Sequence, residues 1–226
     1  MKKLLLGLTA AALMLAMTGC AKEETKKAEK PKTAEKKPTK QKQEDTLTHG
    51  TWKDNVYYNS YLNLSFQLPD GFIYANDEQL AKLMNITVED ISEGSKLAKE
   101  ILKQRVIIDM AVQQSDNGSG VNLVLEDLST ISGYQDFTEA DYAEAAKDLL
   151  EKQGAVIMGT TQEVLAGESY VVIASDSKPG EDVIHNEQYC KKYGKYMLVI
   201  TFSYEYTHEN YCDQLKANFH KGSQGV

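Results

Sequence analysis

The side chains best suited to catalysis or metal binding are four histidines and three cysteines, but their spacing forms no complete catalytic or metal site. His208 and Cys212 are four residues apart, so on a helix they would share one face and could bind a soft metal. His185 and Glu187 are two residues apart and would share one face of a strand. Each pair lacks the further ligands that a metal ion needs. The sequence therefore predicts no metal site and no cofactor.

Motifs typical of catalysis are also missing. The chain contains no G-x-G-x-x-G, P-loop, H-E-x-x-H or G-x-S-x-G pattern. Two β-lactamase-like elements occur, S-x-x-K at 175–178 and S-D-N at 115–117, but in the wrong chain order and without a following K-T-G. Short patterns of this kind arise by coincidence, so we expect no enzymatic activity.

Cys190 and Cys212 could form a disulfide if the protein is exported. Such a bond would close a loop of about 22 residues and stabilise the fold by roughly 3 kcal/mol. The alternative is that Cys212 is a buried thiol, because it falls in the apolar stripe of the last expected helix. The expected strand register places Cys190 opposite Val199. It does not decide which face the last helix covers, so both alternatives stay open.

One stretch of the chain is acidic throughout, since no basic residue occurs between Arg105 and Lys147. It could form an acidic surface that binds Ca²⁺ or a basic protein partner. The alternative is a solvated surface that keeps the domain soluble. No D-x-[DN]-x-[DN]-G spacing supports a calcium loop. The acidic residues of this stretch are Asp109, Asp116, Glu126, Asp127, Asp136, Glu139, Asp141 and Glu144.

Four tyrosines alternate on the expected C-terminal hairpin, where they could form an aromatic binding surface. Cross-strand packing is the alternative that we favour. These residues are Tyr189, Tyr193, Tyr196 and Tyr204.

The strands that position these side chains follow from alternating hydrophobicity and turn residues. Gly194-Lys195 suits a two-residue type II′ turn between the last two strands. Residues 115–120 suit a polar, glycine-rich hairpin loop. The expected strands are 56–59, 62–68, 105–113, 121–128, 155–165, 168–175, 183–193 and 196–204.

Helices are expected where a capping residue precedes an apolar stripe. Asn76 with Gln79 indicates a helix over 77–84, and a second helix is expected from Thr87 to about Lys103. Thr138 with Asp141 begins the clearest helix, which runs to about residue 153. Thr207 is expected to cap the last helix, whose buried face would comprise Tyr211, Cys212, Leu215 and Phe219. The pattern predicts an α+β fold, a mainly antiparallel twisted sheet covered by helices.

The N-terminus has the features of a secretory signal. Met1 to Lys3 is positively charged, and 4–17 is mostly apolar but too short to span a membrane comfortably. It ends in Met17-Thr18-Gly19-Cys20, which resembles the lipobox of bacterial lipoproteins, with Met17 in place of the usual Leu. The resemblance implies cleavage before Cys20 and a diacylglyceryl group on its sulfur. We therefore expect 1–19 to be a signal peptide and Cys20 to anchor the protein to the extracytoplasmic face of a membrane.

Residues 20–49 are expected to form a disordered tether behind the lipidated Cys20. This segment has nine Lys and six acidic residues and almost no core-forming side chains, so burial cannot offset the entropy of ordering it. The remainder, 50–226, is expected to be a single domain with 14 basic and 27 acidic residues. Its net charge of −13 excludes a nucleic-acid binder, which needs a basic surface.

Two parts of this domain resemble known families. Tyr58-Asn59-x-Tyr61 followed by L-x-F-x-L-P-x-G-F at 64–72 is similar to the opening of PsbP-like (PsbP/DcrB-type) domains. The runs D-M-A at 109–111 and V-N-L-V-x-E-D-L at 121–128 resemble a group of lipoproteins from Gram-positive anaerobes. The resemblance implies an α/β/α sandwich used chiefly by accessory and protein-binding subunits.

Three classes of function remain. The leading hypothesis is a lipid-anchored extracytoplasmic accessory or interaction protein, bound to the membrane through Cys20 and able to meet a basic protein partner. The second is a lipoprotein that binds a small ligand or a cation. The third is a hydrolase using two carboxylates with perturbed pKa values in one cleft. The sequence leaves the oligomeric state open.

Overall fold

Two antiparallel sheets and three α-helices make up the described part of the molecule. The computed structural model describes residues 47–85, 103–114, 119–178 and 182–222. The α+β class and the mainly antiparallel sheet expected from the sequence are confirmed.

The larger sheet has seven strands, and its C-terminal four form a meander. Neighbouring strands pair antiparallel throughout. In spatial order the strands are β4 (Phe72–Tyr74), β5 (Val106–Gln114), β6 (Gly120–Asp127), β10 (Tyr196–Glu205), β9 (Ile184–Tyr193), β8 (Glu168–Ser177) and β7 (Val156–Leu165).

The smaller sheet joins the N-terminal strands to the C-terminal one. Its order is β1 (Thr51–Lys53), β2 (Val56–Asn59), β3 (Leu64–Gln67) and β11 (Phe219–Lys221). The sequence predicted one sheet, and two are found. The second sheet was missed because its two outer strands, β1 and β11, have three residues each and are too short to show periodicity.

The α-helices are α1 (Asp77–Leu83), α3 (Glu139–Lys152) and α4 (Glu209–Ala217), with short 3₁₀ turns η1 (Leu128–Thr130) and η2 (Tyr206–His208). Capping boxes begin α1 at Asn76 with Gln79 and α3 at Thr138 with Asp141, as predicted. The last helix differs from the prediction, because His208 rather than Thr207 precedes it and Phe219 belongs to β11. The helix expected from Thr87 lies largely outside the described residues.

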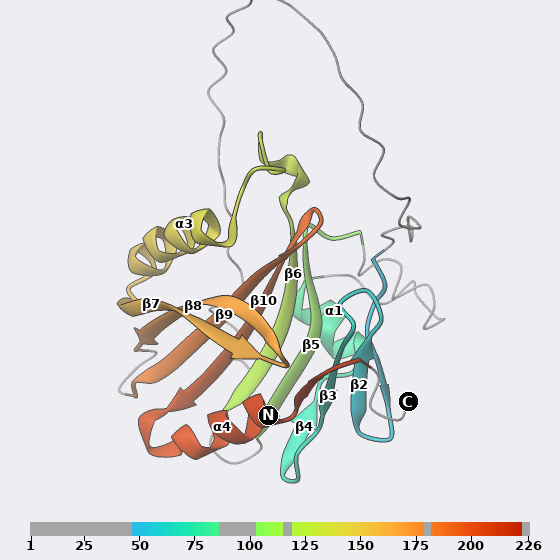
Figure 1. The fold of residues 1–226 in the computed structure, drawn as a ribbon. Helices are drawn as coiled ribbons and strands as arrows, with labels where there is room; N and C mark the ends of the chain where they lie inside the picture. Colours follow the sequence, from blue (N-terminus) through green and yellow to red (C-terminus); the bar gives the residue numbers. More distant parts are fainter. Residues whose placement is uncertain (1–46, 86–102, 115–118, 179–181, 223–226) are drawn as a thin grey trace, which may run out of the picture.

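Strand register assigns the two faces of the large sheet. Val124 faces Val199 across β6 and β10, and these side chains pack in the clusters under α1 and α3 respectively. Leu125 and Leu198, one residue along, belong to the cluster shared with α4 and the small sheet. The large sheet is therefore the middle of three layers. Figure 1 shows α3 beside the β7–β9 half of this sheet, and β2 and β3 on the other side, near β5.

The β9–β10 hairpin agrees with its prediction. Tyr193 pairs with Tyr196, so the turn is Gly194-Lys195, and Gly194 has a φ of 58° while Lys195 is not among the residues with positive φ. This combination matches a type II′ turn. It also places Cys190 opposite Val199, as expected.

Candidate functional site

The most concentrated group of buried polar side chains in the described chain surrounds Asp109. This residue interrupts an apolar run in β5 at a β-bulge, where the register with β6 shifts between Ile108 and Met110. A β-bulge changes the direction in which nearby side chains point. The carboxylate of Asp109 is fully buried. It faces the small sheet rather than water.

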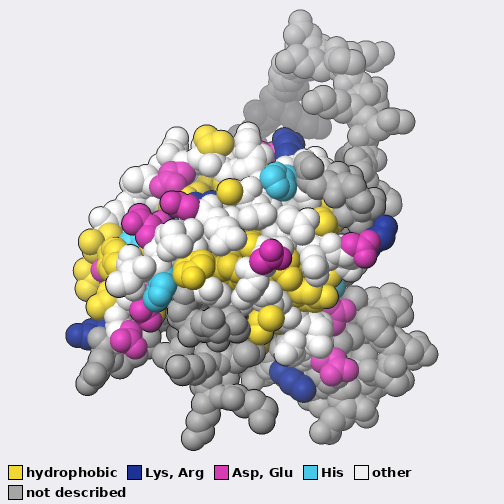
Figure 2. Space-filling model, turned by 90° about the horizontal axis from the view of Figure 1, so that it is seen from below, with side chains coloured by type: hydrophobic (Ala, Val, Ile, Leu, Met, Phe, Trp, Pro, Cys, Tyr) yellow, Lys and Arg dark blue, Asp and Glu magenta, His cyan; other side chains and the backbone are white. Residues whose placement is uncertain are grey.

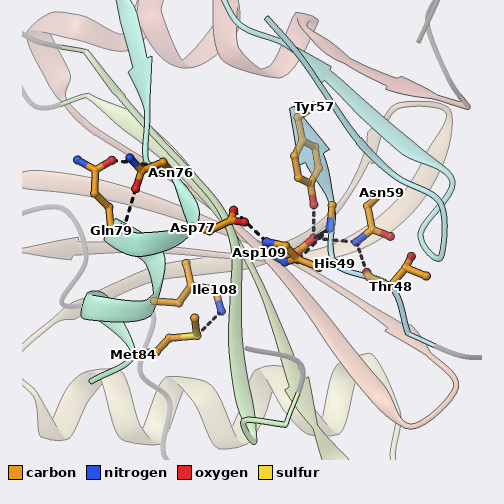
Figure 3. Close-up of polar contacts among 11 residues, drawn as sticks. Thr48, His49, Tyr57, Asn59, Asn76, Asp77, Gln79, Met84, Ile108 and Asp109 are labelled. Atoms are coloured by element: carbon orange, nitrogen blue, oxygen red, sulfur yellow. Dashed lines mark hydrogen bonds and ion pairs between the residues drawn. The ribbon is translucent and has the colours of Figure 1, made fainter. Parts of the chain in front are cut away.

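Four donor atoms from the N-terminal part of the domain make five hydrogen bonds to this carboxylate (Figure 3). The Gly50 amide donates to both oxygens at 3.1 Å, and Asn59 Nδ2 donates to Oδ2 at 2.7 Å. The Tyr57 hydroxyl donates to Oδ2, and His49 Nδ1 pairs with Oδ1. Asn59 also donates to the Thr48 carbonyl at 3.0 Å. Together these contacts fasten residues 48–50 and β2 to the large sheet.

His49 lies between two carboxylates. Its Nδ1 meets Asp109, its Nε2 lies 3.4 Å from Oδ1 of Asp77 at the start of α1, and its side chain is only 7% exposed. Burial opposes the charged ring, but the hydrogen bonds and charges of Asp109 and Asp77 outweigh it and raise the pKa of His49 to about 10. His49 is therefore an imidazolium at neutral pH.

The positive charge of His49 in turn lowers the pKa of Asp109. Burial alone would raise the pKa of Asp109, but the hydrogen bond and charge of His49, with the bonds from Tyr57 and Asn59, hold that pKa below its ordinary value. Both nitrogens of His49 face carboxylates, so neither offers a free lone pair for general base catalysis. The arrangement is suited to holding the chain in place rather than to proton transfer.

This cluster corrects the expected start of the domain. The tether was expected to extend through His49, but Leu47 is buried in the main core and His49 is clamped, so the folded part begins at least three residues earlier. Sequence reasoning missed the roles of His49 and Asp109. The available signal was the lone aspartate within the apolar strand V-I-I-D-M-A-V.

A second polar cluster lies under α4, on the opposite face of the sheet from α3. Glu187 pairs with Lys216 at 2.5 Å and accepts from Tyr204 at 2.7 Å. The Tyr189 hydroxyl bridges Glu187 and Glu163, at 3.3 and 2.5 Å. Burial would raise the pKa of Glu187, yet Lys216 and Tyr204 lower it, so this group is an ionised carboxylate already neutralised by a lysine. It does not supply the protonated acid that a two-carboxylate hydrolase needs.

Glu126 is not part of an acidic surface, contrary to the prediction. It is 2% exposed, accepts from the Tyr142 hydroxyl at 2.9 Å and lies 3.9 Å from Arg105 Nη2. Burial raises its pKa, against the hydrogen bond from Tyr142 and the charge of Arg105. The side chain instead fixes the helix-facing side of β6 to α3.

Most other residues of the expected acidic surface have partners within the fold. Asp127 pairs with Lys195 at 2.6 Å and Glu144 with Lys147 at 2.6 Å. Glu139 accepts from the Lys192 amide at 3.1 Å, and Asp141 caps α3. Asp136 is exposed, and Asp116 lies outside the described residues. Figure 2, which views the molecule from below, shows acidic groups scattered around a band of hydrophobic side chains on that face.

Cys190 and Cys212, the cysteines within the described residues, are free and lie on opposite faces of the large sheet. Cys190 packs in the cluster beneath α3, and Cys212 packs in the cluster shared with the small sheet. The disulfide considered from the sequence is therefore not formed, because α4 covers the face away from Cys190. Burial raises the pKa of the Cys212 thiol to about 12, as expected for an inert structural thiol.

The histidine pairs of the sequence analysis also have other partners. His185 Nδ1 lies 2.7 Å from Asp176, and His208 packs its ring on Tyr211. Within the described residues, no group of three or more His, Cys, Asp or Glu side chains could hold a metal ion. No described helix is long and apolar enough to cross a membrane.

The expected tyrosines of the C-terminal hairpin are mostly packed rather than displayed. Tyr189, Tyr196 and Tyr204 are at most 7% exposed. Tyr189 makes edge contacts with Phe202 and Tyr170. Cross-strand packing, the favoured alternative, describes these residues better than an aromatic binding surface.

Comparisons with known proteins give a likeness of fold to solved structures. No protein-family model matches the sequence, and no curated protein matches it. The fold is similar to the solution structure of cyanobacterial PsbP (CyanoP) from Synechocystis sp. PCC 6803, with a TM-score of 0.45 and 13% identity over 74% of this chain and 91% of that chain. The likeness concerns the fold alone.

Proposed function

We propose that this protein is a lipid-anchored extracytoplasmic accessory protein whose folded domain acts by binding rather than by catalysis. The observation that carries the proposal is the join between the Lys-rich segment and the domain. The chain enters the fold through residues 48–50, where His49 and Gly50 bind the buried carboxylate of Asp109 and the Thr48 carbonyl accepts from Asn59. In a domain that is attached to a membrane through its N-terminal tether, these contacts would hold the first residues of the fold in place.

Membrane attachment is supported by the sequence ahead of this join. Met17-Thr18-Gly19-Cys20 follows an apolar segment, and a diacylglyceryl group with a further acyl chain would anchor the protein stably. If the 26 residues between Cys20 and Leu47 form the tether expected from their composition, the head would reach roughly 30 Å from the bilayer. The acidic domain, with 14 basic and 27 acidic residues beyond position 49, would favour a basic protein partner over nucleic acid.

A binding role is supported by the chemistry of the two polar clusters. His49 is committed to two carboxylates, and Glu187 is neutralised by Lys216, so neither cluster offers a free acid or base. The remaining alternative is a lipoprotein that binds a small ligand. The observation in its favour is that Asn122 Oδ1 and Thr201 Oγ1, on cross-strand partners, are buried without a hydrogen bond.

Crosslinking in intact cells followed by purification of the full chain tests the binding role. The expected result is recovery of a basic partner that is lost from a Cys20→Ala variant, because unanchored protein would leave the membrane. Recovery of the same proteins with both forms, or of none above that control, would contradict the proposal.

A further inference from the structure

The four edges of the two sheets differ sharply in length. Three of the edge strands, β1, β4 and β11, have three residues each, and short edges are a common protection against unwanted strand pairing. The fourth, β7, has ten residues and pairs only with β8 in the described part of the chain. Figure 1 shows it at the outer edge of the large sheet.

The β7 edge also lacks the usual protective residues. Its sequence, V-I-M-G-T-T-Q-E-V-L, contains no Lys, Arg or Pro. Three of its apolar side chains are exposed: Val156 by 61%, Met158 by 56% and Val164 by 73%. A long edge without Lys, Arg or Pro and with exposed apolar groups offers unpaired backbone N–H and C=O groups to another strand. Its register with β8 shifts once, between Ile157 and Gly159.

Charge indicates which strand this edge accepts. The domain carries 27 acidic and 14 basic residues beyond position 49, so two copies repel each other over most of their surfaces. β7 has one charged residue, Glu163, and its carboxylate accepts the Tyr189 hydroxyl at 2.5 Å. This carboxylate keeps its charge but is turned toward Tyr189 of its own sheet, so two β7 strands can approach with only this one charged side chain on each. A basic partner would find on this strand only one carboxylate, which already accepts the Tyr189 hydroxyl.

We propose that β7 is a self-association edge, at which two copies of this protein pair their β7 strands antiparallel about a two-fold axis. Such pairing is isologous, so each strand supplies the surface that the other needs. With the axis near the middle of the strand, Thr160 and Thr161 lie at the centre, and both are exposed in the single chain. The two seven-stranded sheets become one continuous sheet. The inference concerns the folded domain and does not depend on lipid at Cys20.

Thiol crosslinking of the full-length chain in membranes tests the pairing. Thr160→Cys and Thr161→Cys each place a thiol beside the two-fold axis, and the native Cys190 and Cys212 are buried. A short bis-maleimide should convert these variants to a species of twice the monomer mass. Asn210→Cys, exposed on α4, is the matched control, and the unsubstituted chain gives the background from Cys20. Dimer yields no higher than these controls would overturn the proposal.

A charge placed on the edge provides the second arm. Val164→Lys in the Thr161→Cys chain should return the dimer yield to background, because two lysines would then lie in the paired edge and Val164 is too exposed for the fold to need it. Ile73→Lys, on β4 and 51% exposed, should leave the yield unchanged. An equal loss with both lysines would contradict pairing through β7. A crosslinked product of another mass, without homodimer, would show that a different protein occupies the edge and would overturn self-association.

Discussion

At the scale of single residues, the fold depends on a buried charge placed where the chain enters the domain. Asp109 carries its carboxylate into the interface between the two sheets, and His49 supplies the compensating positive charge. Charged groups this deep persist only when they are paired and hydrogen-bonded. Four donor atoms meet the carboxylate of Asp109, which satisfies that condition.

Replacing Asp109 by Asn should therefore be strongly destabilising. The substitution keeps the size of the side chain but leaves the His49 imidazolium without its buried partner, a loss typically of about 3–5 kcal/mol. Urea unfolding followed by circular dichroism measures it. Asp77→Asn is the matched control, because the side chain of Asp77 is 48% exposed and its loss should change the unfolding free energy by at most about 1 kcal/mol. Equal effects of the two substitutions would argue against a buried clamp.

The same pair predicts how stability responds to pH. The pKa of His49 is raised to about 10 from an ordinary 6.5, so the folded state holds the extra proton more tightly than the unfolded state. This contribution is complete below about pH 6.5 and decreases as pH rises through 10. The difference in unfolding free energy between wild type and His49→Gln should accordingly shrink between pH 7 and pH 10. A difference that stays constant over this range would mean that the ring is neutral in the fold.

At the scale of elements, one lysine holds the connection between η1 and α3. Lys192 Nζ donates to the backbone carbonyls of Tyr134, Gln135 and Phe137, each at 2.8 Å. The Lys192 amide also donates to Glu139 in the first turn of α3. A single side chain on β9 thus sets the path of the loop and the position of the helix.

Lys192→Met should destabilise this loop while keeping the aliphatic packing of the side chain. Hydrogen bonds to charged groups are worth roughly 1.5–3 kcal/mol, and the three carbonyls would lose theirs together. Amide hydrogen exchange should quicken over residues 131–138 and the start of α3. Lys195→Met, which removes a half-exposed pair with Asp127, is the control and should leave that exchange unchanged. Unaltered exchange in Lys192→Met would show that the loop holds its path without the ammonium.

The sequence predicted elements better than the contacts between them. Asn76 with Gln79 and Thr138 with Asp141 gave the helix starts, because a capping box is local. Gly194-Lys195 gave the register of Cys190 with Val199, because a two-residue turn fixes it. The disulfide and the acidic surface that included Glu126 failed for another reason. Both depend on which face α3 and α4 cover, and that is decided by packing over long sequence distances.

The Asp109 cluster could not be predicted from spacing, since its members come from positions 49 to 109 and meet only through a bulge. One residue more or less in β5 would turn a side chain to the other face of the sheet. In the sequence, His49 appeared to end the charged linker because residues 48–50 show no periodic pattern of hydrophobicity. Only the contact with a buried carboxylate reveals that they belong to the fold.

At the scale of the whole molecule, one core joins the two sheets. The ring of Phe219 in β11 lies 4.7 Å from Phe66 in the small sheet and 5.8 Å from Phe202 in the large sheet, measured between centroids. All three rings are at most 3% exposed. The small sheet should therefore unfold together with the large one, rather than as a separate unit.

Phe219→Ala tests this cooperativity. Truncating a buried aromatic side chain typically costs about 3–5 kcal/mol, and here the cavity would open between the sheets. We expect a lower denaturation midpoint with one transition, coincident by the Trp52 fluorescence of the small sheet and by far-ultraviolet circular dichroism of all strands. Two separated transitions in the wild-type chain would contradict a shared core.

The charges of the chain are unevenly distributed along its length. The formal charge of −8 combines a basic N-terminal part with a domain of 14 basic and 27 acidic residues. If Cys20 is lipidated, the lysines lie next to the bilayer and the acidic head lies beyond them, where it can meet partners. This arrangement depends on where the mature chain begins.

Mass spectrometry of the mature N-terminal peptide, prepared from membranes of producing cells, tests the central claim most directly. We expect a peptide that begins at Cys20 and carries the mass of a diacylglyceryl group, with further acylation at its amine where that occurs. A mature chain that begins at another residue, or at an unmodified Cys20, would contradict a lipid-anchored protein.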